Sequence, residues 1–395
     1  QAYAYFGSEV VFFIMGAFIL SAAVVGSGLS SRLAMWAVSS FGSTPRRLVL
    51  CFFLVGALGS CFMSEHAVAA MLFPIAMSVT RTLELSTTSP LFGRTLFVAM
   101  AWGCIIGGTT TILGGGRGPL AIGILEEYTA VSDGGQLSIG FMEYVFFGLP
   151  LVLMLLIAGY FLLGKESMTS DVDVETARKR LMVKRSALGA PSIREIGVGL
   201  VMVVTVLCWV VKGHDWGLAN IAICATTALF LLKLTSWREV EEGVNWGVIL
   251  MYGGAICLGA ALHQSGATAW ITAPIKDAEN LSPEVILICL GALSMLLTEL
   301  MSNSAVIAVL VPVALEIGAT QGIDLRVVTM AVVLPSNFAF AFPMATPANA
   351  LAYSSGFLDV RAMMKRGFTM DLIGLAIFAL LVFFYWPHLG YQMGH

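Results

Sequence analysis

The stretch Thr298–Ala305, TELMSNSA, is a polar interruption between two apolar runs, Pro283–Leu297 and Val306–Ile317. Each run is too short to cross a bilayer, because a hydrocarbon core of about 30 Å takes roughly 20 helical residues. We therefore predict a re-entrant helical hairpin with its tip inside the membrane. Non-helical backbone is tolerated there only where protein or a water-filled cavity surrounds it, so the tip is expected to line a binding site.

A second interruption follows at Phe342–Ala350, FPMATPANA, where two prolines and several polar side chains break an apolar segment. This pattern is typical of a broken transmembrane helix. The ends of half-helices carry partial charges and unsatisfied backbone groups that bind ions. A hairpin tip that faces a broken helix is therefore a suitable site for an anion and a small cation.

The composition is that of a polytopic membrane protein. Of the 395 residues, 58% are hydrophobic and 11% are charged, and the mean hydropathy of +0.89 lies well above that of soluble globular proteins. The net charge of −3 gives no reason to expect a nucleic-acid partner. The seven cysteines form no CxxC pair, so we predict neither a disulfide framework nor a cysteine metal site.

A long polar segment, residues 165–194, divides the apolar chain into a first half, residues 1–164, and a second half, residues 195–395. By the positive-inside tendency this linker is expected to be cytoplasmic. Its basic residues are Lys165, Arg178, Lys179, Arg180, Lys184, Arg185 and Arg194.

Each half contains the same kinds of segment. The first half has a hairpin at about 48–80 and a broken helix at about 97–130, and the second has them at about 283–318 and 327–356. We also predict an interfacial amphipathic helix over Ser30–Phe41. Full spans are predicted at Val10–Val25, Phe141–Leu163, Ile196–Val211, Trp216–Leu234, Trp246–Leu262 and Phe368–Trp386.

The two halves are also related by an internal repeat. A shift of 238 residues places Ser64 on Ser302 and Pro74 on Pro312. A shift of 231 residues places the glycine-rich break Gly114–Gly118 on residues 345–349. Such duplication predicts two inverted repeats with the binding site at their interface. The expected fold is thus an all-α polytopic membrane protein.

These motifs resemble those of the divalent anion/sodium symporters (DASS), which carry dicarboxylates, citrate or sulfate. Ser302-Asn303-Ser304, followed by Pro312, is similar to the Ser-Asn-Thr signature of that family, and Ala345–Asn349, ATPAN, is similar to its Ala-Thr-Pro-Pro-Asn loop. The resemblance covers the whole chain, although family members usually carry about three further spans before the position of Gln1.

The resemblance implies a homodimer in which a transport domain moves like an elevator against a scaffold. It implies that the hairpin tips hold the substrate, with Ser302, Asn303, Ser304, Thr346 and Pro347 as contacts in the second half. It also implies a sodium site formed by Thr298, Asn303 and Ala345, with backbone from the nearby Met301. Neutral hydroxyl, amide and carbonyl oxygens suit a hard cation such as sodium.

The first half departs from the family pattern. It has Ser64-Glu65-His66 where Ser-Asn-Thr is expected, and Gly115-Gly116-Arg117-Gly118 where Thr-Pro-Pro-Asn is expected. An ionisable residue at the bilayer centre costs roughly 2.5–3.5 kcal/mol on insertion scales, so these side chains are expected to be paired and functional. We predict that Ser64, Glu65, His66 and Arg117 contact substrate and that no sodium ion binds there.

The role of Arg117 stays open between two alternatives. It forms a bidentate salt bridge with Glu65, or it replaces the missing sodium ion and attracts the anion directly. An unpaired Arg117 penalises the return of the empty carrier and favours anion exchange, whereas a paired one permits sodium symport. His66 adds a possible proton coupling. Glu65, His66 and Arg117 are therefore the predicted coupling residues.

Structural roles compete with these interpretations. Glu65 and His66 would then lie at a hairpin tip in cytoplasmic water, and Arg117 would only clamp the glycine-rich loop. Thr109, together with the two threonines after it, bonds either to its own helix backbone or to the site. Glu299 is expected to be a structural partner for a half-helix end.

The predicted function is secondary active transport of a small divalent anion, a C4-dicarboxylate such as succinate first and sulfate second. Sodium coupling through the second site is the first choice, and sodium-independent or proton-linked anion exchange is the alternative. An anion channel is a rival of a different class. The chain carries no HExxH, GxSxG or aspartyl-pair motif at usable spacing, so we predict no enzyme and no organic cofactor. The expected location is the cell membrane.

Overall fold

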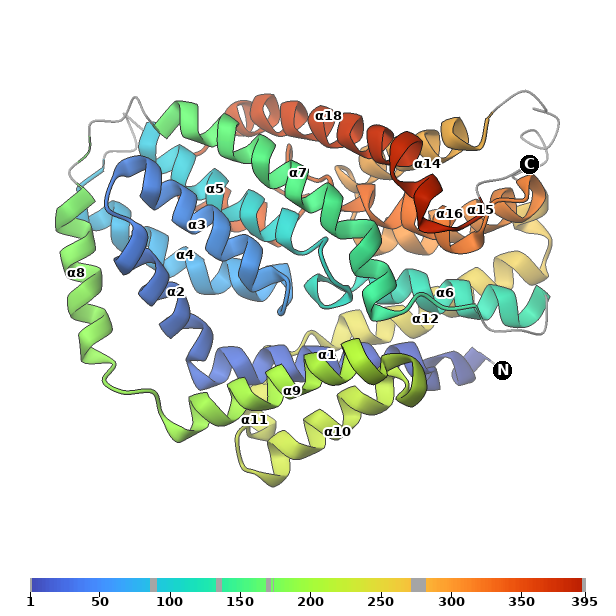
Figure 1. Cartoon of the computed structure of the whole chain (residues 1–395), viewed down its shortest axis with the longest axis horizontal. Coiled ribbons are helices and arrows are strands. Elements are labelled where there is room, and N and C mark those ends of the chain that lie inside the picture. The colour runs from blue at the N-terminus through green and yellow to red at the C-terminus, as the bar shows by residue number, and fades with distance from the viewer. Residues whose placement is uncertain are drawn as a thin grey trace.

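The computed structural model describes residues 2–85, 91–132, 137–167, 172, 174–270 and 282–392. These residues form helices joined by turns and loops (Figure 1). Six of the helices in these described ranges are long and apolar enough to cross a membrane. They are α1 (Glu9–Ser27), α7 (Phe141–Ser167), α9 (Ile193–Trp216), α12 (Trp246–Gln264), α15 (Asn303–Gln321) and α18 (Val360–Phe384).

The two hairpins are pairs of helices joined by short turns. The first pair is α3 (Pro45–Ser60) and α4 (Glu65–Thr82), and the second is α14 (Pro283–Thr298) with α15. In Figure 1 the first hairpin enters the molecule from the end where α8 (Val174–Ala187) lies, and the second enters from the opposite end. Their turns therefore approach each other in the middle of the molecule.

Two apolar segments are broken where the sequence has glycines or prolines. In the first, α5 (Leu91–Gly107) is followed by a short 3-10 turn, η2 (Ile112–Gly114), and then by α6 (Arg117–Ser132). In the second, α16 (Leu325–Val333) and η3 (Pro335–Asn337) precede an extended stretch that ends at α17 (Pro347–Ser354). Proline is favoured in the first turn of a helix and disfavoured in its interior, so Pro347 starts α17 after the break.

Close packing of α3 against α5 holds the first hairpin beside the first broken helix. A Cβ atom on Gly103 would lie 2.1 Å from the carbonyl oxygen of Phe53, and one on Gly107 would lie 2.1 Å from that of Ala57. Any side chain at these two glycines would push the helices apart. The glycines therefore fix the position of the first hairpin relative to the centre.

The remaining helices surround this core. In Figure 1, α1, α9, α10 (Leu218–Leu231) and α12 lie along one side of the molecule, and α12 also packs against α15 of the second hairpin. The predicted linker, residues 165–194, contains α8, and residues 168–171 and 173 of that linker lie outside the described residues. The other elements are η1 (Ala2–Gly7), α2 (Leu29–Phe41), α10 (Leu218–Leu231), α11 (Trp237–Gly243) and η4 (Trp386–Leu389).

Candidate functional site

The two hairpin turns line one cavity of about 1030 Å³. We call residues 61–66 tip 1, residues 298–304 tip 2, residues 114–118 the glycine loop and residues 342–347 the proline loop. All four line the cavity, together with parts of α1, α11 and α12. Every residue predicted to contact substrate is among them: Ser64, Glu65, His66, Arg117, Ser302, Asn303, Ser304, Thr346 and Pro347.

Helix N-termini lie on this cavity. Ser64 caps α4, Ser302 caps α15 and Thr346 caps α17, each by accepting a backbone N–H of the first turn. The first residue of α6, Arg117, lines the same cavity. Helix N-termini carry a partial positive charge and free N–H groups. The arrangement is therefore suited to an anion even before side-chain charges are considered.

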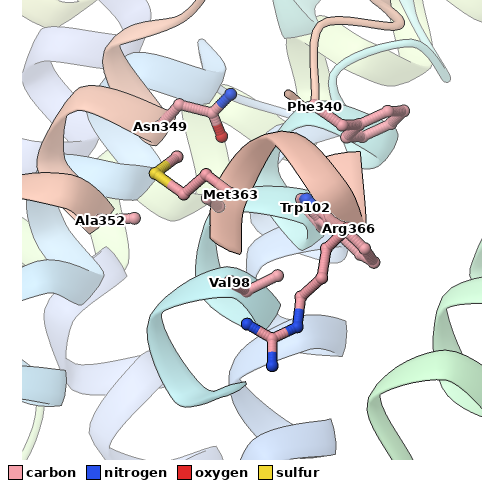
Figure 2. Close-up of a pocket in the computed structure, with 8 residues that line it drawn as sticks. Val98, Trp102, Phe340, Asn349, Ala352, Met363 and Arg366 are labelled. Carbon is pink, nitrogen blue, oxygen red and sulfur yellow. The ribbon is translucent and has the colours of Figure 1, made fainter. Parts of the chain in front are cut away.

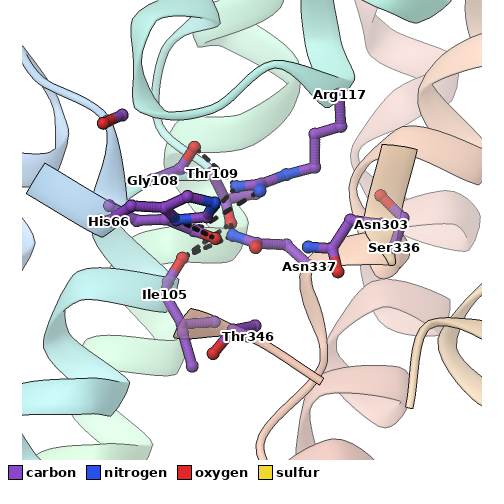
Figure 3. A network of polar contacts seen from close by, with 12 residues as sticks. His66, Ile105, Gly108, Thr109, Arg117, Asn303, Ser336, Asn337 and Thr346 are labelled. Atoms are coloured by element: carbon purple, nitrogen blue, oxygen red, sulfur yellow. Dashed lines mark hydrogen bonds and ion pairs between the residues drawn. The ribbon is translucent and has the colours of Figure 1, made fainter. Parts of the chain in front are cut away.

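Arg117 and Glu65 form a buried ion pair across the cavity wall. The side chains are 4% and 1% exposed, and Arg117 Nη2 lies 3.3 Å from Glu65 Oε2. Nη1 approaches the same oxygen at 3.4 Å, so the contact is not the two-oxygen fork that a bidentate salt bridge requires. Nη2 also donates to the Gly108 carbonyl at 3.0 Å, which holds the guanidinium against the end of α5 (Figure 3).

His66 is the second ionisable group of tip 1, and with Glu65 and Arg117 it forms a cluster of three. Its Nδ1 atom lies 3.6 Å from Glu65 Oε1, and its side chain is 53% exposed. Since His66 also lines the cavity, this exposure is toward the space in which substrate would lie. Glu65 is thus placed between a buried guanidinium and a cavity-facing imidazole. Tip 1 therefore presents ionisable groups to the cavity where the family pattern expects neutral oxygens.

Tip 2 gathers neutral oxygens instead. Thr298 Oγ1 lies 2.8 Å from Asn303 Oδ1 and 2.9 Å from the Ser336 carbonyl oxygen. Thr298 is buried below the cavity surface, whereas Asn303 and Ala345 line it. Hydroxyl, amide and carbonyl oxygens are the ligands that a sodium ion takes. The chemistry of this donor set fits the sodium site expected at Thr298, Asn303 and Ala345.

Glu299 ties tip 2 to the proline loop. Its two carboxylate oxygens accept the backbone N–H groups of Ala341 at 2.9 Å and Phe342 at 3.0 Å. Glu299 is only 4% exposed. Glu299 thus bonds to backbone, but the prediction that its partner is a half-helix end is wrong, because these amides belong to an extended stretch. Asp371 of α18 is within hydrogen-bonding reach of Glu299 and accepts the Phe340 N–H.

The threonines after α5 were predicted to bond either to their own helix backbone or to the site, and the structure has one of each kind. Thr109 donates to the Ile105 carbonyl of its own helix and also contacts the Asn337 amide (Figure 3). Thr111 donates across to the Cys61 carbonyl of tip 1 at 2.7 Å. The bond from Thr109 to Ile105 is local, whereas the bond from Thr111 to Cys61 supports the cavity wall.

Three buried polar residues near the site were missed by the sequence analysis. Asn337 of η3 reaches from the second broken helix to Thr109 of the first (Figure 3), Tyr252 projects from α12 into the cavity wall, and Asp371 contacts Glu299. Asn337 had a detectable signal, because Pro335-Ser336-Asn337 interrupts an apolar run. The charge of Asp371 inside a predicted span was also visible. Tyr252 had no such signal.

A separate cavity lies behind the proline loop. Its volume of about 10 Å³ is close to that of one water molecule. Trp102, Phe340 and Arg366 line it, and so does Asn349 (Figure 2). The Asn349 side-chain amide donates to the carbonyls of residues 339 and 342, which holds the extended stretch in place. This cavity is too small for an organic anion.

Residues 1–392 match the family model described as the sodium:sulfate symporter transmembrane region. The sodium-dependent dicarboxylate transporter SdcS of Staphylococcus saprophyticus is 24% identical over 410 residues, covering 97% of this chain and 78% of that protein. SdcS of Staphylococcus aureus is 24% identical over 408 residues, covering 97% of this chain and 77% of that protein.

Two solved transporter structures share the fold. The YdaH transporter of Alcanivorax borkumensis has a TM-score of 0.64 at 17% identity, covering 100% of this chain and 89% of that one. MtrF of Neisseria gonorrhoeae has a TM-score of 0.67 at 15% identity, covering 97% of this chain and 83% of that one. The chain is thus a multi-pass integral protein of the cell membrane and a transporter, not an enzyme. Because the family model spans almost all of it, the chain belongs to the divalent anion/sodium symporter (DASS) family.

Proposed function

We propose that this chain is a secondary active transporter of a small divalent anion, coupled to sodium through one site at tip 2. A C4-dicarboxylate such as succinate is the first candidate, and sulfate is the second. The observation that carries the proposal is the convergence of both tips and of the starts of α6 and α17 on one cavity. Relatives named sodium-dependent dicarboxylate transporters, at 24% identity, support the choice of substrate and ion.

The ion pair between tip 1 and the glycine loop favours symport over exchange. Arg117 is already neutralised by Glu65, so the empty carrier returns across the membrane without an unpaired charge at this position. A sodium ion bound by Thr298, Asn303 and Ala345 then supplies the coupling. The alternative, sodium-independent or proton-linked exchange, requires Arg117 to separate from Glu65 and follow the substrate anion.

The proposal includes two inverted repeats, residues 1–164 and 195–395, separated by the cytoplasmic linker 165–194. The helices α3 and α14 have 16 residues each, and their first residues, Pro45 and Pro283, are 238 positions apart. The first residues of α4 and α15, Glu65 and Asn303, have the same separation. The opposite entry of the two hairpins in Figure 1 also supports inversion.

We further propose an elevator mechanism in a homodimer, with the hairpins and broken helices moving against the layer formed by α1, α9, α10 and α12. The cavity extends to Gly26 at the end of α1. A Cβ atom on Gly26 would lie 3.8 Å from Arg194, at the end of the basic linker. With that linker in the cytoplasm, this structure is the inward-facing state. The dimer is tested by light scattering in detergent.

The experiment is uptake of labelled succinate into proteoliposomes. One set has an inward sodium gradient and no internal succinate, and a second has internal unlabelled succinate without sodium. Each is compared with protein-free vesicles, and labelled sulfate is run in parallel. Uptake driven by the sodium gradient alone is the expected result. Uptake that needs internal anion and ignores sodium would replace symport by exchange, and flux of both anions without response to either gradient would indicate a channel.

A further inference from the structure

Tyr252 is a cavity-lining residue that belongs to neither hairpin and neither broken helix. It lies in the middle of α12 and is 0% exposed. The helix α12 packs against both α6 and α15, the helices that follow the glycine loop and tip 2. Tyr252 is therefore held where an element of each half approaches the cavity.

The ring of Tyr252 fits against the glycine loop. A Cβ atom on Gly116 would lie only 1.1 Å from the Tyr252 hydroxyl oxygen and 2.4 Å from Cζ. The end of the ring thus occupies the space that any other side chain at residue 116 would fill. This fit brings the phenol beside Arg117, the next residue of the chain and the buried cation of the site.

The hydroxyl group lacks a hydrogen bond of good geometry among the described residues. Ser304 of tip 2, Arg117 and Glu65 line the same cavity as Tyr252. A buried hydroxyl without a partner is unfavourable, and native structures rarely leave one without a reason. A phenol O–H beside the loop that carries Arg117 is a suitable donor for an anionic oxygen.

We propose that the Tyr252 hydroxyl donates a hydrogen bond to the bound anion and determines its affinity. The ligand class is a small anion with carboxylate or sulfate oxygens, and the inference rests on the proposed function of this cavity. Tyr252 thereby adds a contact from α12 to those from the two tips. Because α12 lies outside the elements proposed to move, this contact forms in the inward-facing state.

The test is Tyr252→Phe, which removes the hydroxyl oxygen and keeps the ring. The matched control is Tyr144→Phe, because Tyr144 of α7 is also buried and packs against Gly118 of the glycine loop without lining the cavity. Binding of succinate and of sulfate is measured by calorimetry on purified protein at saturating sodium, and uptake kinetics are measured in proteoliposomes. The Tm of each variant reports folding.

We expect Tyr252→Phe to raise the Kd and KM for the anion roughly 10- to 100-fold, the effect of losing a hydrogen bond to a charged group. The sodium half-saturation concentration and the Tm stay near those of the wild type, and Tyr144→Phe binds normally. Equal affinity in Tyr252→Phe and wild type would overturn this inference alone. If the wild type binds only sulfate and Tyr252→Phe weakens that binding, the inference about Tyr252 stands and the proposed substrate changes to sulfate. Absence of binding of either anion to the wild type would overturn both.

Discussion

Tip 1 and tip 2 start their second helices in the same way and then differ in chemistry. Ser64 accepts the Ala67 N–H at 3.4 Å, and Ser302 accepts the Ala305 N–H at 3.3 Å. The next residue is Glu65 in tip 1, paired with Arg117, and Asn303 in tip 2, beside Thr298. Two similar backbones thus hold an ionised pair on one side of the cavity and neutral oxygens on the other.

The difference concerns what can leave the site. A sodium ion at the proposed tip 2 site would dissociate after each transport cycle, whereas the Arg117 guanidinium beside tip 1 is attached to the chain. If tip 1 has lost a sodium site, its cation is permanent and must be balanced when the carrier is empty. Glu65 supplies that balance in this structure. Tip 1 is then a fixed electrostatic element, and tip 2 alone couples transport to sodium.

The largest expected effect is at tip 2. Asn303→Ala removes an oxygen from the proposed sodium site and a donor from the proposed substrate site. We expect sodium-driven succinate uptake to fall about 100-fold or more, since two charge-assisted contacts are lost. The control is Asn220→Ala, because Asn220 lies on α10 and bonds only to the Trp216 carbonyl among the described contacts. Uptake like the wild type in Asn303→Ala would remove tip 2 from the mechanism.

The next effect is at tip 1. Glu65→Gln leaves the Arg117 charge buried without its counter-ion, and breaking a buried pair in this way costs about 3–5 kcal/mol. We expect a lower Tm and a larger loss of net sodium-driven uptake than of succinate exchange. The double variant Glu65→Gln with Arg117→Gln carries no buried charge there, so its Tm should recover. If the double variant is no more stable than Glu65→Gln, the unpaired charge of Arg117 is not the cause of the lower Tm.

The number of sodium ions gives a smaller but direct test of the asymmetry. With one sodium site at tip 2 and none at tip 1, initial uptake rates should rise hyperbolically with sodium concentration. We expect a Hill coefficient of about 1, measured at saturating succinate. A clearly sigmoidal sodium dependence would show cooperative sodium ions and would contradict the assignment of Arg117 as the fixed cation.

The smallest effect concerns a partly exposed ion pair, which is compared here with the buried Glu65–Arg117 pair. Arg194 lies 2.6 Å from Glu239 at the cavity rim, with side chains 37% and 29% exposed. The hydrogen bond from Arg194 lowers the pKa of Glu239 below its usual range. Such a pair is worth only about 0.2–1 kcal/mol.

Glu239→Gln should therefore lower the free energy of unfolding by that small amount at neutral pH. A carboxyl group with a lowered pKa stabilises the fold above its ordinary pKa, and this stabilisation is lost as the pH falls through the lowered value. The difference in Tm between wild type and variant should thus vanish on acidification. A difference that persists at acid pH would assign the effect to packing.

The segments of this fold follow from local sequence. The run Pro283–Leu297 is too short to span a membrane, and polar or glycine-rich breaks interrupt the chain, so hairpins and broken helices were predictable. The prediction that Val306–Ile317 is also too short is wrong, because α15 extends over Asn303–Gln321 and is long enough to cross, and the predicted span Trp216–Leu234 is the shorter helix α10. Helix bounds moved by a few residues: α5 begins at Leu91, not at Phe97, and α18 begins at Val360, not at Phe368. Arg94 in α5, and Arg361, Lys365 and Arg366 in α18, lower the hydropathy near these starts although the backbone is already helical.

The composition and the tip motifs of the sequence determined the family, and together with the repeat they predicted a two-half organisation and a set of cavity residues. Only the tertiary structure decided that Arg117 pairs with Glu65 through one oxygen, that Glu299 bonds to amides 42 and 43 residues away, and that Tyr252 faces Gly116. Periodicity and length act along the chain, whereas these contacts depend on how α12, the broken helices and the tips pack against one another. The role proposed for Tyr252, a lone tyrosine in an apolar span, therefore depends on residues that are distant in the sequence and near in the structure.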